Sequence, residues 1–188
     1  MEQKLIRFID TSHSDLFLVP DGGNINITSF HGEARTHACR YLDELHVEIS
    51  SDTYHICQLA ELLERNGAVC APEGGMSDTY EIYQIKDTQS IEYCFRPYTD
   101  ASGRFNIADY SRVYAGMLSP KTTLECLYAK HNRDDRPFGQ QMRSLSMSDV
   151  VVLTRQGKKT AWYVDSFGFI ELPKFIRQQQ RYMPGRKA

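Results

Sequence analysis

A stretch rich in hydroxyl and carboxylate groups, SLSMSD at residues 144–149, has side chains that could do chemistry. A serine hydroxyl can act as a nucleophile, but serine hydrolases of the α/β class place it in a G-x-S-x-G turn, which this stretch lacks. The serines alternate with Leu145 and Met147, which is the period of a β-strand with one solvated face. The apolar run 150–153, the turn RQGK and the return at 161–164 then predict a hairpin. These residues predict structure and leave the function open.

Two His-x-Cys pairs raise the question of metal binding: His37 with Cys39, and His55 with Cys57. On a strand, residues two apart share a face, whereas on a helix they diverge by about 200°. The second pair falls where we expect a helix, so we expect its side chains to point apart. Structural zinc sites usually combine C-x₂₋₄-C with H-x₃₋₅-H spacing; the chain has no C-x₂₋₄-C pair, and its one H-x₅-H spacing, His31 to His37, has no such partner. We therefore expect no metal and no cofactor.

Cysteine chemistry is a second enzymatic hypothesis. Five cysteines are widely spread and never form a C-x-x-C pair, which is typical of reduced thiols in a cytoplasm. Cys57 and Cys126 each lie near the apolar stripe of a predicted helix, where a thiol packs as a small hydrophobic group. A cysteine-dependent enzyme stays open as an alternative, because catalytic groups assemble in space rather than in sequence. Our expectation is a protein that is not an enzyme.

Charge is distributed unevenly along the chain. Residues 1–75 hold five basic and twelve acidic groups, a net charge of −7, and the rest holds 17 basic and 12 acidic groups, a net charge of +5. The first part therefore suits a basic partner and the second an acidic one. We expect an acidic partner-binding face on the first part, formed by Glu44, Glu48, Glu61 and Glu64.

A basic patch is expected on the second part of the chain. It would comprise Arg133, Arg136, Arg143, Lys158 and Lys159. Aromatic residues are interleaved with these cations, and such a combination suits single-stranded nucleic acid or a phosphate backbone. The patch predicts weak, non-specific DNA or RNA binding, with the alternative that the cations only keep the module soluble.

The elements that position these residues divide at a predicted linker, residues 71–78, where a proline and a glycine pair interrupt the periodicity. The first module, residues 1–70, has β-prone runs at 5–9, 16–19, 25–30 and 35–45. Ser51 or Thr53 can cap a helix that ends near Gly67. Its buried stripe is predicted to be Ile56, Leu59, Ala60 and Leu63.

The second module, residues 79–188, mixes both kinds of element. Strands are expected at 80–86 and 91–95, and helices at 106–118, 124–131 and 174–181. Thr122 or Thr123 can cap the second of these helices. The fold class is therefore α+β, with two small modules, each a mixed or antiparallel sheet with one or two packed helices.

Composition sets the outer limits. The chain has 188 residues, 41% hydrophobic and 24% charged, which is enough for a packed core. No apolar run approaches the ~20 residues of a membrane helix. The opening MEQKLIRFID lacks the apolar region of a signal peptide. We expect a cytoplasmic protein that does not bind membranes, and the sequence leaves its oligomeric state open.

Several separate sequence segments across residues 78–175 resemble the YodL-like domain family: YEIYQIKD, YSRVYAGML, TLECLYAKHN, SLSMSDVVVL and WYVDSFGFIELPKF. The first module resembles a domain associated with large polyvalent proteins, through FIDTSHSDLFLVPDGGNINIT, CRYLDELH and YHICQLAELLE. These resemblances supply no catalytic residues. They imply that the SLSMSD signature is an element of the fold, whose hydroxyls close a turn and whose Asp149 bonds backbone N–H groups.

The same resemblances imply a setting. Such domains occur in proteins of phages, plasmids and conjugative elements of bacteria, often beside counter-defence functions, and the chain is similar in size to some inhibitors of type II CRISPR-Cas nucleases. The expected function is non-enzymatic inhibition of a CRISPR-Cas effector nuclease with its guide RNA, in the cytoplasm of a bacterial host cell. A general interaction module of a polyvalent mobile-element protein is the alternative.

Overall fold

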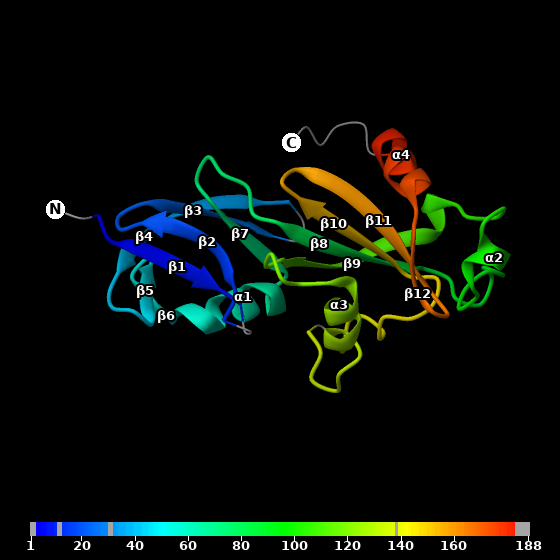
Figure 1. Cartoon of the computed structure of the whole chain (residues 1–188), viewed down its shortest axis with the longest axis horizontal. Helices are drawn as coiled ribbons and strands as arrows, with labels where there is room; N and C mark the ends of the chain where they lie inside the picture. Colours follow the sequence, from blue (N-terminus) through cyan, green and yellow to red (C-terminus); the bar gives the residue numbers. More distant parts are fainter. Residues whose placement is uncertain (1–2, 11–12, 30–31, 138, 183–188) are drawn as a thin grey trace. The chain divides into compact units, whose positions relative to one another are not determined.

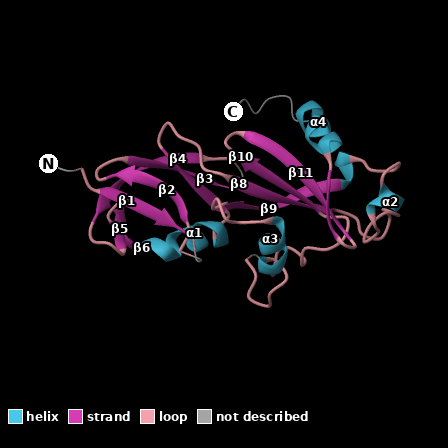
Figure 2. Cartoon of the chain, in the orientation of Figure 1, coloured by secondary structure: helices cyan, strands magenta, loops and turns pink. Residues whose placement is uncertain are grey.

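A computed structural model describes residues 3–10, 13–29, 32–137 and 139–182. Twelve strands, four α-helices and one 3-10 helix lie within these residues, and the predicted α+β class is confirmed (Figure 2). The chain divides into two compact units. The first holds residues 1–80, 115–122 and 155–157, and the second holds 81–114, 123–154 and 158–188. Within the described residues, no helix is both long and apolar enough to cross a bilayer.

The first unit contains two antiparallel sheets (Figure 1). One is the pair β1 (Leu5–Ile9) and β2 (Asp15–Pro20). The other has the order β6-β5-β4-β3-β7, and each neighbouring pair in it runs antiparallel. Its strands are β3 (Asn24–Ser29), β4 (Ala34–Tyr41), β5 (His46–Ile49), β6 (Asp52–His55) and β7 (Ala68–Pro72). The predicted strand at 25–30 is thus β3, except that Phe30 lies outside the described residues.

The helix of the first unit is α1 (Ile56–Arg65), which packs against β1 and β7. Its predicted buried stripe is confirmed, and Gly67 adopts the left-handed φ of 67° just after the helix. The predicted start is wrong: residues 52–55 form β6, so α1 is preceded by an extended His55 rather than by a Ser51 or Thr53 cap. Of the predicted linker, Ala71 and Pro72 continue β7 and pair with β3.

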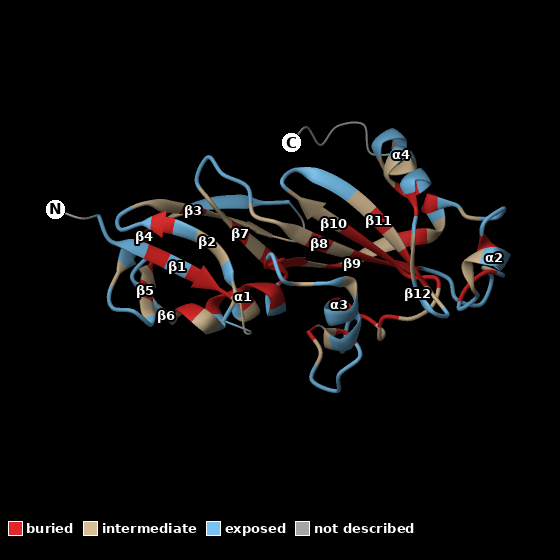
Figure 3. Ribbon diagram, in the orientation of Figure 1, coloured by how far each residue is buried: buried red, intermediate tan, exposed pale blue. Residues whose placement is uncertain are grey.

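The second five-stranded sheet has the order β12-β11-β10-β8-β9. Its strands are β8 (Thr79–Ile85), β9 (Tyr110–Met117), β10 (Val150–Arg155), β11 (Lys158–Asp165) and β12 (Gly168–Glu171). Val150, Val151 and Val152 are each 0% exposed, so both faces of β10 are covered (Figure 3). The helices are α2 (Tyr98–Ala101), the 3-10 helix η1 (Ile107–Asp109), α3 (Leu124–Lys130) and α4 (Pro173–Tyr182).

One hairpin and two helices of the second module confirm the sequence patterns. Residues 150–155 and 158–165 form the predicted hairpin, and its two-residue turn, Gln156 and Gly157, has φ values of 49° and 76°. Helix α3 is capped by the Thr123 hydroxyl, which accepts a hydrogen bond from the Cys126 N–H. Helix α4 begins at Pro173, and its Phe175 ring lies 4.9 Å from the Tyr83 ring, edge to face.

Three predictions for the second module are wrong. Tyr110 to Met117 is strand β9 rather than part of a helix, because β-branched and aromatic residues favour a strand even at helical spacing. Residues 91–95 form turns instead of a strand. Residues 144–148 form a loop and a turn, although their polar and apolar side chains alternate as in a strand.

Candidate functional site

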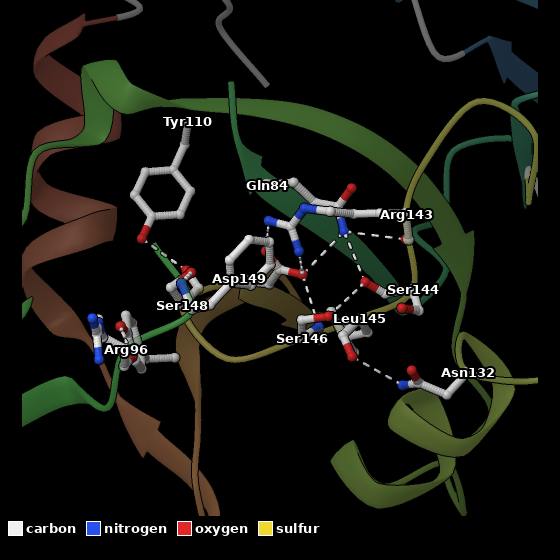
Figure 4. Close-up of polar contacts among 12 residues, drawn as sticks. Gln84, Arg96, Tyr110, Asn132, Arg143, Ser144, Leu145, Ser146, Ser148 and Asp149 are labelled. Carbon is white, nitrogen blue, oxygen red and sulfur yellow. Dashed lines mark hydrogen bonds and ion pairs between the residues drawn. The ribbon is translucent and has the colours of Figure 1, made fainter. Parts of the chain in front are cut away.

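The carboxylate of Asp149 is the centre of a buried polar network in the second unit (Figure 4). Asp149 is 0% exposed and stands just before β10. Arg143 donates to both carboxylate oxygens, with one Nη1 to Oδ2 bond of 2.8 Å. The Ser146 N–H donates at 2.9 Å, and the amide of Gln84 on β8 donates at 3.0 Å. The predicted role of Asp149 as an acceptor of backbone N–H groups is confirmed.

The surroundings of this carboxylate act on its charge in opposite directions. Burial raises the pKa of Asp149 to about 6, while Arg143, the Ser146 N–H and Gln84 hold that pKa down. At neutral pH the group is therefore an anion surrounded by donors. An anion held this way ties the 143–149 loop to β8.

Ser148 uses its main chain and its side chain to join this loop to a second one. Its φ of 74° is left-handed, which is unusual for a residue other than glycine. Its Oγ accepts the Phe95 N–H at 3.0 Å, and its carbonyl accepts the Tyr110 hydroxyl at 2.8 Å. The Tyr163 hydroxyl donates to the Arg96 carbonyl at 2.7 Å. Two tyrosines of the sheet thus fix both turns.

What the network presents to solvent is an aromatic ring with the Arg143 guanidinium beside it. Phe95 also has a left-handed φ, 60°, and is 43% exposed. The Arg143 guanidinium lies 4.8 Å from the centre of its ring, and Arg96 is exposed next to it in the chain. We call Phe95, Arg96 and Arg143 the Phe95 surface. An exposed ring can stack on a base or an aromatic side chain, and an exposed arginine next to it in the chain can bind phosphate or carboxylate groups.

Sequence reasoning missed Phe95, Arg96 and Gln84 as parts of a site. Gln84 could have been identified from the sequence, because it alternates in register with the apolar residues Tyr80 and Ile82 on β8. In the structure it is only 4% exposed. A polar residue in an apolar register indicates a buried hydrogen-bond partner. No sequence pattern identifies Phe95 as a site residue, because its backbone N–H is bonded by Ser148, 53 residues away in sequence.

Four of the five predicted basic residues have polar partners in the structure. Arg133 makes a two-pronged contact with Asp135, at 2.8 and 2.6 Å. Arg136 donates to carbonyls of its own loop. Arg143 is paired with Asp149, and Lys159 lies 3.9 Å from Glu81, whereas Lys158 is exposed. Among the predicted residues, only Arg143 belongs to the Phe95 surface.

The four predicted acidic residues are also divided. Glu44 is exposed, while Glu48 receives two hydrogen bonds from Arg40, at 3.0 and 2.6 Å. Glu61 pairs with Arg65 one turn along α1, at 2.5 Å. Glu64 is 4% exposed and accepts the Met117 N–H at 3.1 Å, so it belongs to the core of the first unit. It cannot be part of an exposed acidic face.

The cysteines and histidines differ from expectation in two places. Cys126 is exposed rather than packed. The Cys57 Sγ lies 2.7 Å from His55 Nδ1, so this pair points together rather than apart. Across the part of the chain that the structure describes, no group of three or more His, Cys, Asp or Glu side chains is arranged to hold a metal ion.

The chain belongs to the YodL-like domain family, whose model matches residues 79–175, just over half of the sequence. The matched segment contains the whole Asp149 network and the Phe95 surface. A search of curated proteins and a search of solved structures found no match.

Proposed function

We propose that the protein works by binding, without catalysis, and that the Phe95 surface is its contact site. The observation that carries this proposal is that Phe95 combines a left-handed φ of 60° with an exposed ring. A non-glycine residue in that conformation costs on the order of 1–3 kcal/mol and persists only where its surroundings enforce it. A rigid, exposed aromatic residue loses little entropy on binding, which favours a contact role.

The proposed partner is a type II CRISPR-Cas effector nuclease with its guide RNA. Support comes from the resemblance to domains of mobile genetic elements that accompany counter-defence functions, with action in the cytoplasm of a bacterial host cell. The mechanism is occlusion. The first part of the chain, with a net charge of −7, faces a basic nucleic-acid channel, and the Phe95 surface contacts RNA or the protein beside it.

The test is cleavage of target DNA by purified type II nuclease–guide complexes, with and without this protein. We expect cleavage to slow, with the concentration for half-inhibition rising with salt, because screening acts over about 8–10 Å near physiological ionic strength. Adding the protein before or after the DNA identifies the blocked step. Binding without inhibition indicates a general interaction module, and absence of both binding and inhibition overturns the proposal.

Contact with nucleic acid is assayed separately. Gel shifts over a salt series measure any weak, non-specific DNA or RNA binding by the protein alone. Lys158 is exposed, whereas the Lys159 ammonium is already paired with Glu81, 3.9 Å away. Replacing both lysines with alanine is therefore expected to remove about one phosphate contact and to flatten the slope of log K against log salt by about one unit. An unchanged slope removes these lysines from any nucleic-acid contact.

A further inference from the structure

A thiol and an imidazole meet where β6 gives way to α1 in the first unit. His55 is the last residue of β6 and has an extended backbone, with φ −77° and ψ 128°. Cys57 is the second residue of α1. Because the helix begins only after His55, the two side chains lie on the same side, and the Cys57 Sγ lies within hydrogen-bond distance of His55 Nδ1, at 2.7 Å. A helix covering both residues would have separated them.

The pair continues into a short row of titratable groups. His46 on β5 is the cross-strand partner of His55, and their rings lie 5.3 Å apart at 86°, edge to face. His46 Nδ1 in turn lies 2.9 and 3.0 Å from the carboxylate oxygens of Asp43. The order carboxylate, imidazole, imidazole, thiol places a base beside the sulfur and a carboxylate at the far end of the row.

Cys57 also differs from the other described thiols in access and surroundings. Cys39 and Cys70 are each 1% exposed, and burial raises the pKa of the Cys39 thiol to about 11. Cys94 is 8% exposed. Cys57 is half-buried in the first turn of α1. Cys126 is exposed, with its Sγ 3.5 Å from the Thr123 hydroxyl.

We propose that Cys57 is a nucleophilic modification site, with His55 as its base, that exchanges with low-molecular-weight disulfides. His55 Nδ1 takes the thiol proton, and the thiolate attacks one sulfur of the disulfide RS–SR. The Cys57–SR bond forms, the S–S bond breaks, and RS⁻ leaves and is protonated by solvent. A free thiol reverses the reaction. This inference is independent of the proposed binding function, because it concerns the first unit and a different set of residues.

The experiment is reaction of the reduced, full-length protein with oxidised glutathione at pH 7, with each cysteine quantified by peptide mass mapping. Cys126 serves as the reference in the same molecule because it is more exposed and lies in the first turn of a helix too. We expect Cys57 to be modified about ten-fold faster than Cys126, because His55 Nδ1 lies 2.7 Å from the Cys57 sulfur and can take its proton, whereas the Cys126 sulfur has only the Thr123 hydroxyl beside it. A Cys57 rate equal to or below that of Cys126 overturns the proposal without any variant.

Two variants separate activation from simple access. His55→Gln removes the base and is expected to lower the Cys57 rate about ten-fold while leaving Cys126 unchanged. Cys126→Ser is the matched control and should leave the Cys57 rate as it is. Circular dichroism checks that each variant is folded. A folded His55→Gln variant whose Cys57 reacts at the wild-type rate shows that His55 is not the base, and it contradicts the assignment.

Discussion

At the scale of single residues, Asp149 and Arg143 form the pair on which the Phe95 surface depends. Asp149 is 0% exposed, whereas the Arg143 side chain is 25% exposed. The consequences of removing either partner therefore differ. An unpaired Arg143 can turn toward water, but an unpaired Asp149 stays buried and its charge is left without compensation.

Replacing Arg143 with methionine is expected to lower the free energy of unfolding by about 3–5 kcal/mol at pH 7. The deficit should shrink on acidification. Burial already raises the pKa of Asp149 to about 6, and loss of Arg143 removes a group that holds it down. Protonation then removes the uncompensated charge. Denaturant unfolding of wild type and variant at pH 5 and pH 8 measures the effect, and a deficit that is larger at pH 5 contradicts this account.

His131 provides a pH effect of the opposite sign. Burial lowers its pKa to about 3, with Lys130 and Arg136 acting in the same direction, and its ring lies 4.6 Å from Tyr114. The unfolded chain therefore binds a proton that the folded chain excludes, so this contribution to stability is complete above pH 6.5 and is lost as pH falls toward 3. Between pH 7 and pH 5 we expect a loss of about 2 kcal/mol.

The variant His131→Phe should lack this loss, and the measurement is the difference in unfolding free energy between wild type and variant across the pH series. Taking the difference cancels the contribution of Asp149, which is common to both proteins. A constant difference between pH 7 and pH 5 shows that His131 is not buried as a neutral group.

Residue roles could be predicted from sequence only where their partners are close in the chain. Asp149 accepts from Ser146, three residues earlier, and this was anticipated. The contact of Ser148 with Phe95 spans 53 residues. Arg143 and Lys159 have carboxylate partners that also depend on the fold, Asp149 and Glu81, and the sequence does not reveal these pairings.

At the scale of elements, the turn between β10 and β11 gives a direct test of local backbone preference. Gln156 and Gly157 both have positive φ, the requirement of a type I′ turn, for which Asn-Gly is the preferred sequence. Gln156→Asn is expected to stabilise the protein by about 0.5 kcal/mol. Gly157→Ala should destabilise it by about 1 kcal/mol or more, because residue 157 has a left-handed φ of 76° and the added Cβ would lie 3.2 Å from the Met76 side chain. Thermal unfolding that ranks these variants in the reverse order is incompatible with this turn.

The type of an element can be predicted where the spacing of its apolar residues and their helix or strand propensities agree. Helix α1 has both an apolar stripe and good helix formers, and its core-facing residues were identified correctly. In β9 they disagree: Tyr110, Val113, Tyr114 and Met117 occur at helical spacing, but tyrosine and valine favour strands. Gly116 has a packing reason: a Cβ there would lie 2.6 Å from the Tyr80 ring. Such close approach is invisible to a periodicity argument.

At the scale of the whole molecule, the α+β class predicted from the pattern of strands and helices is confirmed, but the two compact units are not consecutive ranges of the chain. Residues 115–122 and 155–157 lie in the first unit although the sequence places them in the second module. The net charges of the two parts of the chain follow from the sequence, but whether an individual charged residue is exposed or paired follows only from the structure. A charge-reversal experiment on the acidic half must omit Glu64, because a lysine at this 4% exposed position would disrupt the core.

The central claim is that the Asp149 network holds Phe95 as the contact residue of a binding protein. The most direct test compares Phe95→Ala with Phe167→Ala in the nuclease inhibition assay, both variants confirmed as folded. Phe167 is the matched control, because it is 101% exposed in the turn before β12. We predict that Phe95→Ala weakens inhibition about 30-fold, equivalent to about 2 kcal/mol, and that Phe167→Ala changes it by less than about three-fold. Equal effects of the two variants, or full inhibition by Phe95→Ala, would contradict the claim.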